Sequence, residues 1–150
     1  LSEQLSKSTG LRGQVAGETS LSTVGKTGAG LTYRGYDVVD LAAHAEFEEI
    51  AFLLLRGHLP NQKELKDYKE RLEGFRGLPK ALKNVLEEIP SDSHPMDVMR
   101  TGTSVLGCLE TEKDFSEEDD KIDRMLSLLP SIITYWYRFS HDGVKIDTAT

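Results

Sequence analysis

The stretch 94–109 constrains the fold more than any other part of the sequence, because it joins a helix start signal to an almost wholly apolar surface. Pro95 suits the first position of a helix, since its φ is preset and no amide donor is needed there. Ser93 or His94 is the predicted cap, and Asp97 would lie near the positive end of the helix dipole. We therefore predict a helix over this stretch.

Most of the circumference of this predicted helix is apolar. At about 100° per residue, the polar side chains fall in one narrow stripe, formed by Asp97, Arg100, Thr101 and Ser104. Gly102 and Gly107 are expected to let a neighbouring backbone approach closely. A helix with so little polar surface belongs inside a helical core or between two subunits.

Length and charge narrow the classes of function. The chain has 150 residues, for which one domain is the default, and a formal net charge of -7. This acidic balance, without a run of Lys or Arg, argues against a nucleic-acid partner. Cys108 is the only cysteine, so no internal disulfide can form, and a cytoplasmic location is expected. No apolar run approaches membrane-spanning length, and no secretory signal is recognisable.

Local patterns predict a mostly helical chain that starts with a small β-hairpin. Residues 1–12 are polar and are predicted to form an arm. A strand is predicted over 15–24 and its partner over 31–34. Apolar spacing then predicts helices near 37–45, 47–57, 61–77, 78–89, 95–109 and 116–143, with Pro130 kinking or breaking the last of them. The acidic linker 110–120 is predicted to be a solvated surface.

The sequence spacing of the candidate residues does not fit a metal site or a catalytic triad. No metal site is predicted, because none of the histidines has a second ligand three or four residues away: His44, His58, His94 and His141. Ser140, His141 and Asp142 have the residue types of a nucleophilic triad. Consecutive side chains cannot stack in a relay, however, which favours an ordinary loop.

At two residues, a functional role is an alternative to a purely structural one. His94 stands at the N-terminus of the apolar helix, where the dipole disfavours imidazolium, although a role as cap or interface residue is favoured over catalysis. Arg71 lies between Tyr68 and Phe75 at the border of an apolar helix face, where its guanidinium could hold a substrate carboxylate bidentately. An ordinary surface arginine with a buried stem is the alternative.

Four segments occur in a consistent order along the chain: residues 15–26, Gly30-Leu-Thr-Tyr-Arg-Gly-Tyr-Asp37, residues 47–57 and His94-Pro-Met-Asp-Val-Met-Arg-Thr-Gly102. Together they resemble the N-terminal part of the citrate synthase family. Arg76-Gly-Leu-Pro79 and residues 131–143 are most similar to its 2-methylcitrate synthase branch.

This resemblance implies a fold and a partner. Residues 13–150 would form the N-terminal part of an all-α large domain, with the small hairpin at its start, in a two-domain homodimer whose subunits meet through antiparallel helices. The helix that begins at His94 is similar to one in that interface. The predicted interface residues are His94, Met96, Val98, Met99, Gly102, Val105, Leu106 and Leu109.

The resemblance also implies an acyltransferase. It would condense propionyl-CoA with oxaloacetate and water to give 2-methylcitrate and CoA, or acetyl-CoA to give citrate in the alternative. The CoA thioester is then a substrate, and no cofactor is implied. Family members use two histidines and an aspartate from later sequence, so no catalytic residue is assigned here, and Arg71 is the one predicted substrate ligand. A helical dimerisation module without chemistry of its own is the hypothesis from another class.

Overall fold

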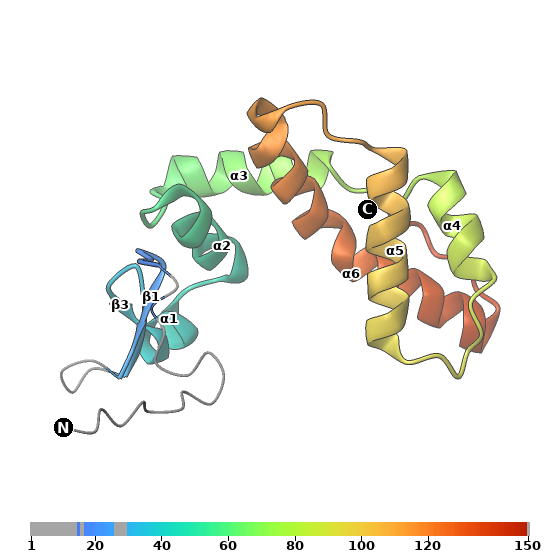
Figure 1. The fold of residues 1–150 in the computed structure, drawn as a ribbon, viewed down its shortest axis with the longest axis horizontal. Coiled ribbons are helices and arrows are strands. Elements are labelled where there is room, and N and C mark those ends of the chain that lie inside the picture. Colours follow the sequence, from blue (N-terminus) through green and yellow to red (C-terminus); the bar gives the residue numbers. More distant parts are fainter. Residues whose placement is uncertain (1–14, 16, 26–29, 150) are drawn as a thin grey trace, which may run out of the picture. The chain divides into compact units, whose positions relative to one another are not determined.

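The computed structural model describes residues 15, 17–25 and 30–149. They divide into two compact units, one ending at Pro60 and the other beginning at Asn61. The elements of each unit are labelled in Figure 1.

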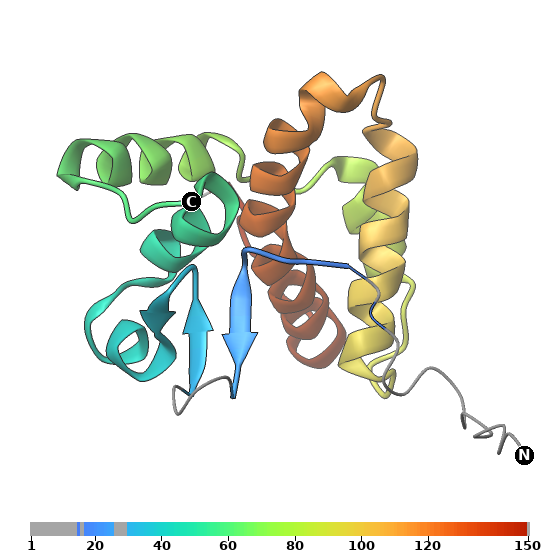
Figure 2. The same ribbon diagram turned by 60° about the vertical axis from the view of Figure 1, so that its left-hand side comes forward.

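A three-stranded antiparallel sheet opens the first unit. Its strands β1 (Ser22–Val24), β2 (Leu31–Tyr33) and β3 (Tyr36–Asp37) lie in that order (Figure 2). The predicted hairpin is therefore confirmed, but β3 was not predicted. The predicted strand over 15–24 is too long, because Ser22 already pairs with Tyr33 at the end of β2. Residues 17–21 lie beyond that point and have no facing strand residue among those described.

Two helices complete the first unit. Helix α1 (Val38–His44) begins where its sequence predicts, with the carboxylate of Asp37 accepting from the amide of Val39 at 2.7 Å. Helix α2 (Phe47–Arg56) starts with a reciprocal capping box between Glu46 and Glu49. It ends at Gly57, whose φ of 92° requires the left-handed conformation that glycine adopts without strain.

The turn between β2 and β3 places a bulky residue in an unusual conformation. Arg34 and Gly35 have φ values of 49° and 91°, the signs of a two-residue type I′ turn. The side chain of Arg34 offsets this strain by donating to the hydroxyl of Ser20 and to the carbonyl of Leu54, both at 2.8 Å. The turn is thereby fastened to α2.

Helices make up the second unit. They are α3 (Gln62–Gly74), α4 (Lys80–Glu87), α5 (Pro95–Leu109), the 3-10 turn η1 (Phe115–Glu117) and α6 (Glu118–Asp142). Helix α6 packs against α3, α4 and α5, and α4 also packs against α5 (Figure 1). The shared core consists of Leu78, Leu82, Leu86, Val98, Leu106, Leu128, Ile132, Tyr135 and Trp136.

Helix α6 runs through Pro130 without a break. Of the two outcomes predicted at Pro130, a kink or a break, the break is wrong, because buried Leu128 and Ile132 anchor the helix to the core on either side of the exposed proline. The hydroxyl of Thr134 donates to the carbonyl of Pro130 at 2.8 Å.

The two glycines of α5 have different surroundings. A Cβ added to Gly102 would lie 2.6 Å from Cγ2 of Ile132, so α5 and α6 approach closely at this position, as predicted. At Gly107 an added Cβ would meet nothing within 4 Å among the described residues. Gly107 is exposed, so no described part of this chain approaches it closely, and an approach by a second subunit stays a prediction.

The segment after α6 returns to the start of α4. Thr148 is only 4% exposed, and its hydroxyl accepts a hydrogen bond from the amide of Leu78 at 3.0 Å. Ile146 packs against the helical core, while Lys145 binds the carboxylate of Glu87 at 2.6 Å. This segment is therefore part of the second unit's packing.

Candidate functional site

His94 caps α5. Its Nδ1 accepts a hydrogen bond from the amide of Met96 at 3.1 Å, and Pro95 occupies the first helical position. An Nδ1 that accepts this bond carries no proton, so the proton of the neutral ring lies on Nε2. The structure thus confirms the predicted role as a cap.

The predicted interface residues fall into two groups. Val98, Gly102 and Leu106 are buried within the chain's own helical unit, so their side chains have almost no surface left for a partner. Met99 and Val105 are partly buried beside that core. The exposed members lie near the two ends of α5 and are His94, Met96 and Leu109. The interface as a whole stays a prediction.

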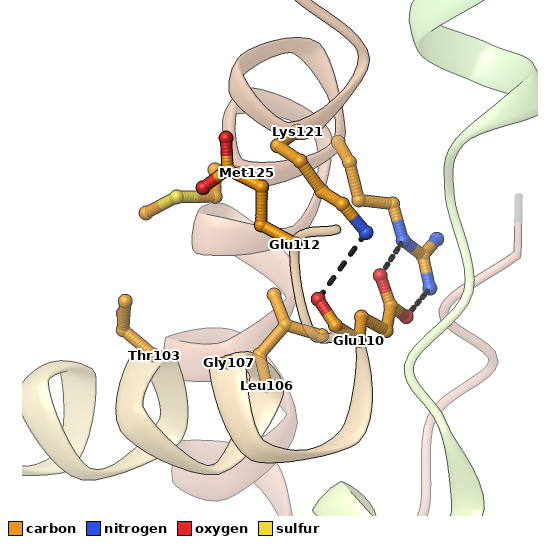
Figure 3. Close-up of a pocket in the computed structure, with 8 residues that line it drawn as sticks. Thr103, Leu106, Gly107, Glu110, Glu112, Lys121 and Met125 are labelled. Carbon is orange, nitrogen blue, oxygen red and sulfur yellow. Dashed lines mark hydrogen bonds and ion pairs between the residues drawn. The ribbon is translucent and has the colours of Figure 1, made fainter. Parts of the chain in front are cut away.

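A cavity of about 320 Å³ opens between the C-terminal half of α5 and the N-terminal half of α6 (Figure 3). Its lining combines apolar and charged side chains: Thr103, Leu106, Gly107, Glu110, Glu112, Lys121, Arg124 and Met125. Gly107 offers no side chain to fill the space on the α5 side.

The charges at this cavity are largely matched with one another. Arg124 binds the carboxylate of Glu110 through Nε at 3.1 Å and Nη2 at 2.7 Å, and also donates to the carbonyl of Phe75. Lys121 donates to the Glu110 carbonyl at 3.2 Å. The hydrogen bonds from Arg124 hold the pKa of Glu110 below its ordinary value. This arrangement joins three segments and leaves neither Arg124 nor Glu110 poised for proton transfer.

Arg71 is engaged by two carboxylates. Its Nε donates to Asp123 at 2.8 Å, its Nη2 donates to Asp120, and its guanidinium lies 5.1 Å from the ring centroid of Phe75. The hydroxyl of Tyr68 donates to the other oxygen of Asp123 at 3.0 Å. The guanidinium therefore ties α3 to α6, and substrate binding by Arg71 stays a prediction.

Sequence analysis missed Asp123, which is completely buried. Its position is nine residues before Ile132, which places the two on opposite sides of α6 at about 100° per residue. Asp123 therefore faces α3. The spacing of apolar residues in α6 identifies only the other side of the helix, which faces the core. No pattern in the sequence near Asp123 indicates a buried acid.

The Ser140, His141 and Asp142 series lies in the last turn of α6, in agreement with the helix predicted over 116–143 and not with an ordinary loop. The Nδ1 of His141 is 2.9 Å from the Ser140 hydroxyl and 3.1 Å from the carbonyl of Tyr137. A carbonyl can only accept, so Nδ1 carries the proton and cannot act as a base toward Ser140. Asp142 pairs with Arg138 at 2.8 Å. The three residues do not form a triad.

The other histidines also have local structural contacts. The Nδ1 of His44 lies 3.0 Å from the carbonyl of Asp40, and the ring of His58 meets Phe52 edge-on with centroids 5.3 Å apart. Within the described part of the chain, no three His, Cys, Asp or Glu side chains gather as a metal site would require. None of the described helices is both long enough and apolar enough to cross a membrane.

Comparison with known proteins gives matches over nearly the whole chain. Residues 10–150 match the family described as citrate synthase, C-terminal domain. The chain is 67% identical over 141 residues to the 2-methylcitrate synthase of Shewanella oneidensis, covering 94% of this chain and 38% of that protein. It is 39% identical over 127 residues to a citrate synthase of Mycolicibacterium smegmatis, covering 83% of this chain and 34% of that protein.

A solved structure shares the fold. It is the ternary complex of citrate synthase from Thermoplasma acidophilum with carboxymethyl coenzyme A and oxaloacetate, which superimposes with a TM-score of 0.81 at 27% identity. The match covers 92% of this chain and 37% of that one. The chain thus spans less than two fifths of the length of these relatives.

Proposed function

The chain belongs to the citrate synthase family, and on that premise we propose that it is the N-terminal part of a 2-methylcitrate synthase. Such an enzyme is an acyltransferase that condenses propionyl-CoA with oxaloacetate and water to 2-methylcitrate and CoA. The observation that carries the branch is the 67% identity to the 2-methylcitrate synthase of Shewanella oneidensis over 94% of this chain. We propose that the protein serves propionate catabolism in the cytoplasm.

The catalytic groups are proposed to lie outside residues 1–150. Condensation requires a base for the carbon next to the thioester and donors for the enolate and the ketone. In the part of the chain that the structure describes, His94 and His141 have structural contacts, and the buried Asp123 is bonded to Arg71. The CoA thioester is a substrate in this proposal, and no further cofactor is involved.

An assay of CoA release tests this function. The full-length protein is incubated with oxaloacetate and either propionyl-CoA or acetyl-CoA, and the free thiol is followed with a thiol-reactive dye. A higher kcat/KM with propionyl-CoA supports 2-methylcitrate synthase. A preference for acetyl-CoA would move the protein to citrate synthase, and release from neither thioester would refute both.

We further propose that the protein is a homodimer in which α5 meets its twin. Two exposed apolar residues support this, because Met96 is 68% and Leu109 is 45% exposed at the two ends of the helix. Partly exposed Met99 lies about 60° around the helix from Met96, and partly exposed Val105 lies about 40° from Leu109, so each end of α5 presents its own apolar surface. A charge at Val98 would not test the dimer, because Val98 is 1% exposed and belongs to the chain's own core.

Sedimentation velocity on the Met96→Glu, Leu109→Glu double variant tests the dimer. The variant is expected to sediment as a monomer, because each substitution places a charge in the proposed apolar contact. Phe115→Glu is the matched control, since Phe115 is 89% exposed but lies on η1 outside α5. A dimer that persists in the double variant would exclude α5 as the contact. A dimer without CoA release would favour the dimerisation module.

A further inference from the structure

An exposed methionine and an open cavity lie on the same side of α5. At about 100° per residue, Met96 falls within about 20° of both Thr103 and Gly107 around the helix. Met96 is 68% exposed, whereas Thr103 and Gly107 line the cavity of about 320 Å³ between α5 and α6 (Figure 3). One line along α5 therefore carries a protruding side chain near its start and a hollow near its end.

Met96 cannot fill this cavity in its own chain. Positions 96 and 107 are separated by about 16 Å along the axis, at about 1.5 Å per residue, which is beyond the reach of the side chain. A Cβ added to Gly107 would meet nothing within 4 Å among the described residues. The space beside Gly107 is therefore open to another chain.

A twofold axis brings the protruding side chain and the hollow together. In an antiparallel pair of identical helices, each residue faces the one that lies equally far on the other side of the axis, so every contact occurs twice. With the axis level with the point midway between positions 101 and 102, the partner subunit's Met96 faces Gly107. Positions 96, 100, 103 and 107 alternate steps of four and three residues, the spacing at which side chains of paired helices interdigitate.

Two polar residues meet at the centre of this pairing. Arg100 and Thr103 lie equally far from the axis, so each Arg100 faces the partner subunit's Thr103. Arg100 pairs with Asp97 at 2.9 Å, which gives its charge a counter-ion at the contact. The hydroxyl of Thr103 can accept a further hydrogen bond from the guanidinium.

We propose that Met96 of each subunit inserts into the cavity beside Gly107 of the other. This register rests on the α5 dimer proposed above and specifies it. The four heavy atoms of the side chain need roughly 120 Å³, at about 30 Å³ for each water-sized group, so the cavity has room for them. An unbranched thioether adapts to an irregular gap, and Leu106 and Met125 supply apolar contact.

Disulfide cross-linking of the full-length protein tests the register. Cys108→Ser removes the native thiol, and Met96→Cys with Gly107→Cys is then introduced and oxidised with copper phenanthroline. Helix axes about 8–10 Å apart, with Cα atoms about 2.3 Å from each axis, bring facing Cα atoms to within about 5 Å, which suits a disulfide. The double variant is expected to run as a covalent dimer on a non-reducing gel.

Matched variants separate this register from other contacts. Met96→Cys alone and Gly107→Cys alone should stay monomeric on the gel, because like positions lie about 16 Å apart across the axis. Met96→Cys with Leu109→Cys should also stay monomeric, since Leu109 lies about 140° around α5 from Met96. Cross-linking of this control as readily as of the 96–107 pair would overturn the register.

Sedimentation of the unoxidised protein gives a second, independent measurement. Met96→Ala should raise the dimer dissociation constant about hundredfold, because each dimer loses two buried side chains worth about tenfold or more each. Phe115→Ala, at a residue that is 89% exposed on η1, should leave it unchanged. A dimer that neither cross-links through 96 and 107 nor weakens in Met96→Ala would refute the register alone, whereas an unsubstituted protein that sediments as a monomer would refute the proposed dimer itself.

Discussion

Replacing Gly102 by alanine is expected to destabilise the protein, although alanine is the better helix former. On an exposed helix this substitution gains about 1 kcal/mol. At Gly102, however, the new Cβ would lie 2.6 Å from Cγ2 and 3.4 Å from Cδ1 of Ile132. Ile132 has no exposed surface, so it cannot turn into solvent to make room.

Overpacking of a core costs about 1–3 kcal/mol, and a contact this short belongs at the upper end of that range. After the gain in helix propensity, the free energy of unfolding should fall by about 2 kcal/mol. Urea unfolding followed by the fluorescence of Trp136, which is 1% exposed in the same core, measures the change.

Gly107→Ala is the matched control on the same helix. An added Cβ meets nothing within 4 Å there, so only the propensity gain of about 0.5–1 kcal/mol remains. Ile132→Leu supplies a second control, because it moves the branch from Cβ to Cγ at equal volume. The cost of Gly102→Ala should fall by about 1 kcal/mol or more in that background. Stabilisation by Gly102→Ala, or an equal cost in both backgrounds, would refute the reasoning.

Three further predictions concern titratable side chains of the helical unit. Asp123→Ala should lower the free energy of unfolding in urea by about 1–2 kcal/mol, because the hydroxyl of buried Tyr68 loses this acceptor, whereas Arg71 is 40% exposed and keeps Asp120. The pKa of Glu110 lies below its ordinary value of 4.5, so the free energy of unfolding should decline as the pH falls from 4.5 through the folded-state pKa of Glu110. Acid titration of Glu110→Gln should lack the contribution of this carboxylate to the decline. Burial raises the pKa of Tyr135 from 10.0 to about 12, so stability should fall with rising pH across that window, and Tyr135→Phe should abolish this alkaline loss.

The starts of the helices could be predicted from the sequence because their caps are local. The side chains of Asp37, Asn61 and His94 each accept an amide hydrogen bond from two or three residues further along the chain. Such bonds depend on neighbours within one turn, and a window of a few residues contains all the information.

The features that were missed depend on distant partners. Arg34 holds its turn through Leu54, 20 residues away, and Asp123 is hydrogen-bonded to Arg71, 52 residues away. A helical wheel shows which residues of α5 are apolar. It does not show which of them the same chain covers, so Val98 and Met96 received the same assignment although one is buried and the other exposed.

The hydrogen bond from Leu78 to Thr148 sets a practical limit on how the protein can be shortened. Without residues 144–149, the amide of Leu78 would lose its acceptor, and the helical core would lose its contact with Ile146. An expression fragment meant to retain the helical unit should therefore extend at least through Ala149.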